Sequence, residues 1–519
     1  MNLKSNVIVN KHLLFLVVSL LLVFSCSNDE GDKIVTQSDD VPELTSFGFL
    51  ANGNVALYQD IVFQKLPDNS FGANVVHEID LGSIKPTFNY PGKTSMNGKD
   101  IFSGETTLNF GDEFVVQFDG RNVIFRIHRY YAIPVMYIST ENAVGVKSKE
   151  EYVNCSIRID GKNTFEDFAT GDSAPARIRG RGNSTWVFYA KKPYRIKLDS
   201  KEELLGMEAG KDWVLLANYR DPTNFMNAIV FDMARYMEMP YTNSNRFIEV
   251  YLDNNYIGMY QLTEQIEQGK NRIDIDESEG VLLNLDLDDG PDYSPNAGDN
   301  FSSTVYGLPI AAKHPEDQTQ EQLAAIKDDF AEMEQHIQNR DLPKLSQRLD
   351  INSLIDFLII QEITRNVELV SPRSMYMYKD ADNIYHFGPV WDFDGGFAFD
   401  WASMSTGHGY FGSQSWLMGG SNPSTHPGTA YNYISGFFVN MFGNAEFMTA
   451  YKKRCAELNP GMLDYCYERL NDYLLHCDFA MASNAKRWPI GKQHREEIER
   501  LKAWLTTRSS AYSNVVKNY

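Results

Sequence analysis

The sequence of 519 residues is short of positive charge, with 48 Lys and Arg against 69 Asp and Glu and a formal net charge of −21. Proteins that bind nucleic acid or anionic lipid surfaces need a surplus of cations, so the composition argues against both kinds of partner. Five cysteines are too few for a disulfide-built scaffold. The chain also lacks a nucleophile elbow, a Walker loop and an HExxH helix. Any chemistry must therefore lie in less common motifs.

The rest of the composition is that of a folded protein. Hydrophobic residues make up 43% and charged residues 23% of the chain, a balance that excludes global disorder. A chain of this length is too long for one hydrophobic core, so we expect at least two domains.

The first 25 residues have the pattern of a signal peptide. Lys4 and Lys11 give a positive start, and an apolar run follows over residues 13–24. This run is too short for a comfortable membrane span, which needs about 20 residues, and it fits the apolar region of a secretory signal. We therefore predict a signal peptide over residues 1–25 and a location in the cell envelope, at the outer membrane or the cell surface.

Cys26 follows this segment directly. Ser25 and Cys26 after an apolar run resemble the cleavage box of bacterial lipoproteins, in which the cysteine is lipidated and becomes the new N-terminus. Phe24 is bulky for such a box, and an ordinary signal peptide with an unmodified cysteine is the alternative. On the lipoprotein interpretation, residues 26–41 form an acidic, solvated tether, and the lipid on Cys26 is the contact with the membrane.

Residues 42–131 show the alternating pattern of short β-strands. Turn signals such as Asn97-Gly98 and Asp119-Gly120 punctuate the runs, as in a β-sandwich of the immunoglobulin-like type. No cluster of carboxylates or cysteines lies in this stretch. We predict a spacer or binding module without chemistry of its own.

Residues 132–519 mix strands with long helices, which predicts an α+β domain with a helical C-terminal part. Cys466 and Cys477 are eleven residues apart, close to three helical turns, so we expect them on one buried helix face. The predicted elements are a strand at 210–216, a hairpin at 248–262, helices at 227–237, 318–337 and 351–365, and a helical tail from 445 to about 509.

Two long polar loops are predicted at 286–301 and 403–429. Loops of this length inside a domain are often functional. His408 and His426 lie in the second loop and are candidate ligands, with solvated loop histidines as the alternative interpretation.

An arginine- and glycine-rich turn is the first candidate site. Residues 177–186 contain three arginines and two glycines; glycines allow the backbone to approach a ligand closely, and arginine forks suit phosphate oxygens. A plain turn between two strands would have a similar composition. Residues 191–198 then form a predicted strand with Arg195 and Lys197 on one face. Kinases hold the phosphates of a nucleotide with such a turn and lysine strand, whereas a charged edge strand that resists aggregation is the alternative.

The second candidate is an acidic segment, Trp391-Asp392-Phe393-Asp394. On a strand, its two carboxylates would share one face and could both reach a hard cation such as Mg²⁺, which prefers oxygen ligands. The alternative is a pair of turn aspartates that cap a helix. Upstream, Glu368 follows a long predicted helix and precedes a strand, in the order of kinase catalytic and metal loops.

Taken together, these motifs resemble the CotH kinase family, a group of atypical kinases named after a spore coat protein. The resemblance rests on five segments in the order of the family: 179–186, 191–198, 213–221, 258–266 and 391–394. It extends from about Ile133 to the C-terminus. It implies a remote protein-kinase-like fold that uses ATP and a divalent metal, Mg²⁺ or Mn²⁺.

The resemblance also implies roles for particular residues. Asp392 and Asp394 would bind the metal, and Glu368 would orient or deprotonate the acceptor hydroxyl. The remaining implied residues would bind the nucleotide: Arg179, Arg181, Asn183, Lys192, Lys197 and Glu264. Lys197 is preferred over Lys192 as the lysine that binds phosphate.

Three positions depart from the family pattern. Glu368 stands where an aspartate is common, Ser374 where an asparagine is common, and Met226 where an arginine is common. The extra methylene of Glu368 shifts its carboxylate by about an ångström, and a misplacement of that order can cost ~10²-fold in rate. Active, slow and inactive forms are all compatible with the sequence.

The sequence thus predicts an α+β protein in which an immunoglobulin-like β-sandwich precedes an atypical kinase-like domain. The predicted function is transfer of the γ-phosphoryl group of ATP to a hydroxyl of a secreted or surface protein. ATP is scarce outside the inner membrane. The alternative is therefore a cell-envelope scaffold lipoprotein whose inactive kinase-like domain recognises a glycan or a protein partner.

Overall fold

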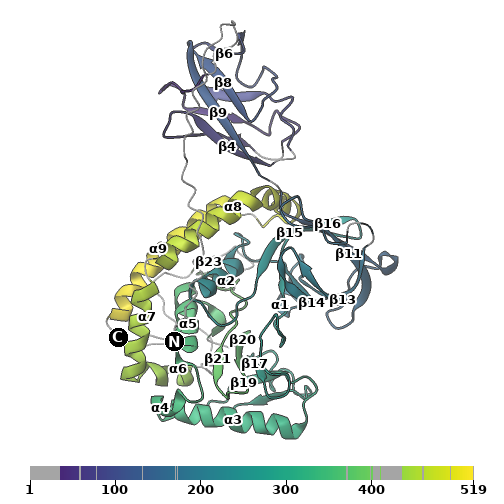
Figure 1. The fold of residues 1–519 in the computed structure, drawn as a ribbon, viewed down its shortest axis with the longest axis vertical. Coiled ribbons are helices and arrows are strands. Elements are labelled where there is room, and N and C mark those ends of the chain that lie inside the picture. The colour runs from purple at the N-terminus through teal and green to yellow at the C-terminus, as the bar shows by residue number, and fades with distance from the viewer. Residues whose placement is uncertain are drawn as a thin grey trace, which may run out of the picture.

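The computed structural model describes residues 35–517 apart from 58–59, 77–78, 131, 170, 172, 370–371, 398, 401–408, 411–434, 459–460 and 491–492. The predicted signal peptide, Cys26, His408 and His426 lie outside the described residues. Within them the chain forms an N-terminal β module, drawn in purple and blue in Figure 1, and a larger α+β body. None of the helices described is long and apolar enough to cross a membrane.

Two sheets pack face to face in the N-terminal module. Their strands are β1 (Ser46–Phe49), β2 (Ile61–Val62), β3 (Gln64–Lys65), β4 (Phe71–Val76), β5 (Pro86–Asn89), β6 (Thr94–Met96), β7 (Lys99–Asp100), β8 (Glu113–Phe118) and β9 (Arg121–Tyr130). The sheets have the orders β2-β1-β5 and β3-β4-β9-β8-β6-β7. Phe47 on β1 and Phe125 on β9 have ring centroids 4.2 Å apart, so aromatic residues of both sheets share one core. The immunoglobulin-like type of this sandwich stays a prediction.

A closed barrel opens the larger body. Its strands are β10 (Val135–Thr140), β11 (Val153–Asp160), β12 (Ala174–Gly180), β13 (Tyr194–Leu204), β14 (Met207–Leu216), β15 (Asn245–Leu252) and β16 (Asn255–Glu264). They are ordered β10-β11-β12-β13-β14-β16-β15, and β10 closes the barrel by parallel pairing with β15. Inward-facing residues such as Ile157, Ile196 and Leu262 are fully buried. At the turn between β15 and β16, Asp253 and Asn254 have positive φ angles of 48° and 63°, which suits a tight hairpin turn.

A second sheet and most of the helices complete the body. The sheet has the order β18-β19-β17-β20-β21, with β17 at Val281–Leu285, β18 at Asn300–Ser302, β19 at Pro309–His314, β20 at Met375–Lys379 and β21 at Tyr385–Phe387. The other elements are α1 (Ser184–Phe188), α2 (Met226–Tyr236), α3 (Gln320–Gln338), α4 (Leu342–Leu345), α5 (Ile351–Thr364), α6 (Ser435–Phe442), α7 (Ala445–Leu458), α8 (Gly461–Arg487), α9 (His494–Lys517), the 3-10 turns Glu141–Ala143 and Val367–Leu369, and the ribbon of β22 (Phe399–Asp400) and β23 (Gly409–Tyr410).

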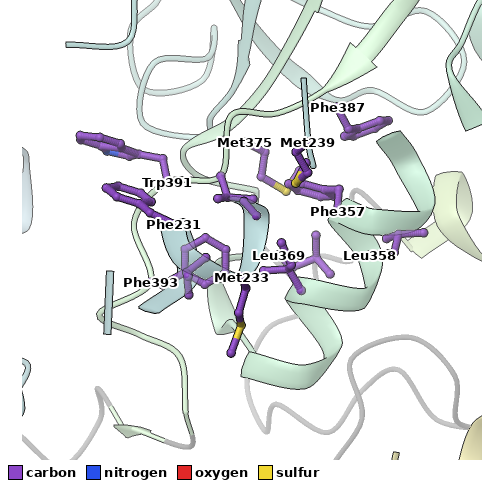
Figure 2. Packing of buried hydrophobic residues seen from close by; sticks show 14 of the residues in the cluster. Phe231, Met233, Met239, Phe357, Leu358, Leu369, Met375, Phe387, Trp391 and Phe393 are labelled. Atoms are coloured by element: carbon purple, nitrogen blue, oxygen red, sulfur yellow. The ribbon is translucent and has the colours of Figure 1, made fainter. Parts of the chain in front are cut away.

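The core of the body anchors the acidic segment 391–394. Figure 2 shows Trp391 and Phe393 among the buried side chains of α2, α5 and the second sheet. The rings of Trp391 and Phe231 are stacked with centroids 5.9 Å apart, and Phe393 is fully buried. The apolar residues of the segment therefore fix it to the core, and the carboxylates of Asp392 and Asp394 extend from this anchored backbone.

Local patterns predicted several elements of the body correctly. The structure confirms the helices predicted at 227–237, 318–337 and 351–365, which are α2, α3 and α5, and the hairpin at 248–262, which is β15 and β16. Cys466 and Cys477 are both 1% exposed on α8, as their spacing predicts. Asp350 caps α5 by accepting hydrogen bonds from the backbone N–H groups of Asn352 and Ser353, which explains why this helix begins where its periodicity does.

Candidate active site

A large polar cleft lies between the barrel and the second sheet. Its volume is about 1170 Å³, and its walls are the turn after β12, the chain after β17, the chain before β20, and the acidic segment. Six residues predicted from the sequence line it: Arg179, Arg181, Asn183, Glu368, Asp392 and Asp394. The fold therefore brings the arginine-rich turn and the acidic segment, which are far apart in the chain, to one site.

The acidic segment is a tight turn, which corrects the prediction that its carboxylates share a strand face. Asp392 has a φ angle of 64°, in the left-handed region that an extended strand excludes. The backbone N–H of Phe393 donates to Asn227 Oδ1 at 2.7 Å, and Asn366 Nδ2 donates to the carbonyl oxygen of Asp392 at 3.4 Å. Residues 395–397 are not helical, so the two aspartates do not cap a helix either.

Burial and mutual repulsion oppose ionisation of the cleft carboxylates. Glu368 is 4% exposed and Asp394 is 8% exposed. Burial raises the pKa of Glu368 well above its ordinary value, and the charge of Asp392 raises it further. Burial and then the charge of Asp394 raise the pKa of Asp392 to about 7, while Arg181 and Arg220 lower it in part. A further cation at this place would stabilise the ionised carboxylates.

The donor chemistry of this cluster fits a hard divalent cation. Glu368 Oε2 is buried and accepts no hydrogen bond, and Arg373 Nη1 lies 3.9 Å from it. A buried oxygen in this state costs free energy that a cation or a proton would offset. Across the part of the chain that the structure describes, no three His, Cys, Asp or Glu side chains gather closely enough to hold a metal ion. Mg²⁺ commonly uses one or two carboxylates and completes its shell with phosphate oxygens and water, so these residues fit a metal that binds together with phosphates.

Lys192 and Lys197 do not lie in the cleft lining. Lys192 Nζ donates to the carbonyl oxygen of Trp186 at 2.5 Å. Lys197 Nζ is 3.3 Å from Asp212 Oδ2, and Arg195, which shares its face of β13 as predicted, pairs with the same carboxylate at 2.8 Å. The alternation of β13 was therefore predictable, but the face that it forms is directed to Asp212 on the neighbouring strand β14.

Glu264, the last residue of β16, also lies outside the lining of the cleft. Its side chain is buried, and burial raises its pKa while Arg272 lowers it in part. The hydroxyl of Thr263 donates to Glu264 Oε2 at 3.4 Å. The structure thus places Glu264 in the packed end of the barrel.

The cleft also contains charged residues that were not named one by one from the sequence, among them Arg220, Asp286, Asp288, Asp289, Lys313 and Arg373. Burial, with the charge of Asp289, raises the pKa of Asp286 to about 6. The three aspartates lie in the long polar loop predicted at 286–301, directly after the apolar strand β17, and loops that follow strands often carry binding residues. Lys313 had no comparable signal, since a single lysine near the end of a strand is common.

Polar contacts connect the turn after β12 on the barrel side of the cleft with the loops of the second sheet on the other side. Asn183 Nδ2 donates to Asp288 Oδ2 at 3.2 Å. The other oxygen of this carboxylate, Oδ1, is 3.3 Å from Arg373 Nε. Because Arg373 also faces Glu368, a continuous polar path runs from the arginine-rich turn to the most buried carboxylate of the site.

Two of the three departures from the family pattern lie in different environments. The side chain of Ser374 hydrogen bonds to Asp392, and its backbone N–H donates to Asp286 Oδ2 at 2.9 Å. Met226 is fully buried, and its N–H donates to Asp221 Oδ2 at 2.7 Å at the start of α2. Ser374 therefore belongs to the site, whereas Met226 belongs to the core.

A family model described as CotH kinase protein matches residues 178–512. This match covers more than half of the chain, so the protein belongs to the CotH kinase family. It begins within β12, ends within α9 and includes every residue of the cleft named above. No curated protein matches the chain in the comparison.

Proposed function

We propose that this protein is an atypical kinase that transfers the γ-phosphoryl group of ATP to a hydroxyl of a secreted or surface protein. Membership of the CotH kinase family makes kinase chemistry the expected class. The observation that carries the proposal is a cleft in which the buried carboxylates of Glu368 and Asp394 and the half-buried carboxylate of Asp392 lie together with arginine side chains. Phosphoryl transfer needs oxygen ligands for a divalent metal and cations for the phosphates in one place.

The nucleotide side of the site is assigned from these positions. Asp392 and Asp394 would hold Mg²⁺ or Mn²⁺, which when bound neutralises charge on the phosphates. Arg181 lies with its guanidinium carbon 5.3 Å from the centroid of the Trp391 ring and close enough to Asp392 for their charges to interact. Its guanidinium can therefore contact a phosphate bound beside the carboxylates.

Glu368 is assigned to the acceptor side. Its carboxylate would take the proton of the acceptor hydroxyl while the new P–O bond forms and the bond from the γ-phosphorus to ADP breaks. Burial and the charge of Asp392 raise its pKa well above the ordinary value, which opposes the ionised form that a base needs. A divalent metal ion held by Asp392 and Asp394 would lower this pKa and would so favour the ionised form of Glu368.

A scaffold without kinase activity is the second candidate function. The positions of Lys192 and Lys197 outside the cleft and the longer side chain of Glu368 favour it. Such a domain would recognise a glycan or a protein partner in the cell envelope and would not require ATP there.

The proposal includes a lipid-anchored location in the cell envelope. Its support is the pattern of the first 26 residues, in which an apolar run ends at Ser25-Cys26. Cys26→Ser should move the protein from the membrane fraction to the soluble fraction. Membrane association that is unchanged in this variant would contradict the anchor.

Thermal unfolding in the presence of nucleotide and metal tests the kinase proposal. A ligand that binds only the folded state raises the free energy of unfolding, by about 2.7 kcal/mol at 100 times its Kd. The full chain should have a higher Tm with ATP and Mg²⁺ or Mn²⁺ together than with either component alone. A Tm that no combination of nucleotide and metal changes would contradict the kinase function and favour the scaffold.

A further inference from the structure

The described lining of the cleft contains two lysines, Lys149 and Lys313. Lys149 lies before β11 at the barrel rim, where its Nζ donates to Asn183 Oδ1 at 2.8 Å. Lys313 lies near the end of β19, an interior strand of the second sheet. The two lysines therefore approach the cleft from opposite walls, and Lys313 is on the wall that carries the acidic loop after β17.

Lys313 forms a partly exposed ion pair with Asp289, in which an anionic ligand can take the place of the aspartate. Its Nζ is 2.7 Å from Asp289 Oδ2, and the side chains of Lys313 and Asp289 are 33% and 39% exposed. Ion pairs with this exposure stabilise a fold only weakly. Asn284 Nδ2 also points to Asp289 Oδ2 at 3.4 Å, so the carboxylate keeps a hydrogen-bond donor when the ammonium group turns to another anion.

The position of Lys313 between two cavities gives it access to an extended ligand. A second cavity of about 660 Å³ lies beside the cleft and is lined by residues 265–268, which connect the barrel to the rest of the body. Asp289, Lys313 and Tyr376 line both cavities. A ligand that extends from the carboxylates toward the second cavity must therefore pass the Lys313 side chain.

Tyr376 connects this position to the candidate metal site. Burial raises the pKa of Tyr376, and its hydroxyl also interacts with Asp286, Arg181, Asp289 and Asp392. The hydroxyl thus lies within range of both the acidic segment and the partner of Lys313. Tyr376 is therefore near both the ion pair of Lys313 with Asp289 and the side chains of Arg181 and Asp392.

We propose that Lys313 is the lysine that binds the phosphates of the donor nucleotide, and that Asp289 holds its ammonium group when no nucleotide is present. The inference rests on the proposed kinase function and replaces Lys197 and Lys192 in this role. A phosphate chain offers several charged oxygens to the ammonium group, so the exchange from Asp289 gains charge-assisted hydrogen bonds. Lys313 acts here as a binding residue and takes no part in proton transfer.

The test compares Lys313→Met with Lys197→Met. Lys197 is a close match, because it is also on a strand, is 37% exposed and pairs with an aspartate at 3.3 Å. The full-length variants are titrated with ATP and Mg²⁺, and separately with tripolyphosphate and Mg²⁺, while Tm is measured. Loss of one charge-assisted contact should weaken both ligands by roughly 10- to 100-fold for Lys313→Met, and Lys197→Met should bind both as the wild type does. The Tm of each variant without ligand shows whether its fold is intact.

The outcomes separate this inference from the kinase proposal. If the wild type responds to ATP and Lys313→Met responds equally well, Lys313 does not bind the phosphates and only the inference is overturned. If both variants lose the response equally, the effect is one of total charge and the inference is again overturned. If the wild type responds to no nucleotide, the kinase proposal fails and the role of Lys313 fails with it. Lys313→Arg, which keeps the charge, should recover part of the affinity.

Discussion

The N-terminal module and the body differ in whether their charged side chains are exposed or buried. Among the described residues of the module, no charged side chain is buried, and ion pairs such as Arg126 with Asp68, at 2.8 Å, lie on its surface. The body buries the carboxylates of Glu368 and Asp394 at the cleft, and these two and the half-buried Asp392 have raised pKa values.

This difference indicates which region requires a ligand. In the surface ion pairs of the module each charge already has an opposite partner, and these pairs contribute little to stability. Buried carboxylates that repel one another lower stability until a proton or a cation neutralises them. Folds keep such groups mainly at functional sites, so we expect chemistry in the body and none in the module.

The largest expected effect concerns the boundary between the two regions. A chain that begins at Ala132 keeps β10 and should fold without the module, whereas a chain that begins at Lys149 lacks β10 and should not fold. Met136 and Ile138 of β10 are 0% and 1% exposed in the barrel core, and the loss of β10 also leaves one edge of β11 and one edge of β15 unpaired. Calorimetry should show a cooperative transition for the longer fragment alone. A folded fragment from Lys149, or an unfolded one from Ala132, would contradict this division of the chain.

Asp392→Asn should abolish metal-dependent binding of nucleotide. The change removes a charge from the candidate metal site, and asparagine tolerates the left-handed backbone of this position. Without ligand the variant should be as stable as the wild type or more stable, because one repelling carboxylate is gone. Asp68→Asn in the module is the control and should leave the nucleotide-dependent rise in Tm unchanged. Retention of that rise in Asp392→Asn would exclude this carboxylate as a metal ligand.

Glu368→Gln should spare nucleotide binding and slow phosphoryl transfer by ~10²- to 10⁴-fold, the usual contribution of a general base. The separation is expected because the base acts on the acceptor and not on the donor. Glu264→Gln changes another buried carboxyl of the body that lies outside the cleft lining, and it should transfer phosphate at the wild-type rate. Transfer to the endogenous acceptor or to the chain itself, measured with labelled ATP, distinguishes the two variants. Equal rates in Glu368→Gln and the wild type would remove Glu368 from the mechanism.

The smallest expected effects are in the pH dependence of stability, and the two regions should differ in sign. The pKa of Asp392 is raised from 3.8 to about 7, so between these values the folded body holds a proton that the unfolded chain lacks. The free energy of unfolding should therefore fall as pH rises from about 4 to 7, by at most about 1.4 kcal/mol per pH unit from this group. The pKa of Asp68 is lowered to about 2 by hydrogen bonds from Ser70 and Arg126, so its contribution is present above about pH 4 and is lost as pH falls toward 2.

Urea unfolding from pH 3 to pH 8, followed separately for the two regions, measures both slopes. Asp392→Asn should reduce the slope of the body between pH 4 and 7, to which other raised carboxyls such as Asp286 also contribute, and Asp68→Asn should reduce that of the module on the acid side. A body whose stability rises with pH between 4 and 7 in the wild type, and equally in Asp392→Asn, would contradict the raised pKa.

The limits of sequence-based prediction are visible in single residues. The helices α2 and α5 and the hairpin of β15 and β16 were predictable because periodicity and turn chemistry are local. Asp392 and Glu368 were recognisable from motifs, but the turn at Asp392 depends on Asn227, which is distant in the chain. The orientation of Lys197 depends on Asp212 of the next strand. Tertiary contacts of this kind leave no local pattern, and this is why the cleft lysine Lys313 was missed.

The closure of the barrel has a consequence for how the chain folds. β10 pairs with β15, with Val135 opposite Glu249, and β16 joins β15 to β14. The hairpin of β15 and β16 therefore fills the place between the first strand of the barrel and its fifth, and until it arrives both neighbouring strands have open edges. Contacts this distant in sequence form slowly, and open edges invite pairing with other chains. When the chain is synthesised from its N-terminus, the incomplete barrel is its most aggregation-prone stage. Pairing of residues 245–264 with β10 and β14 then closes the open edges.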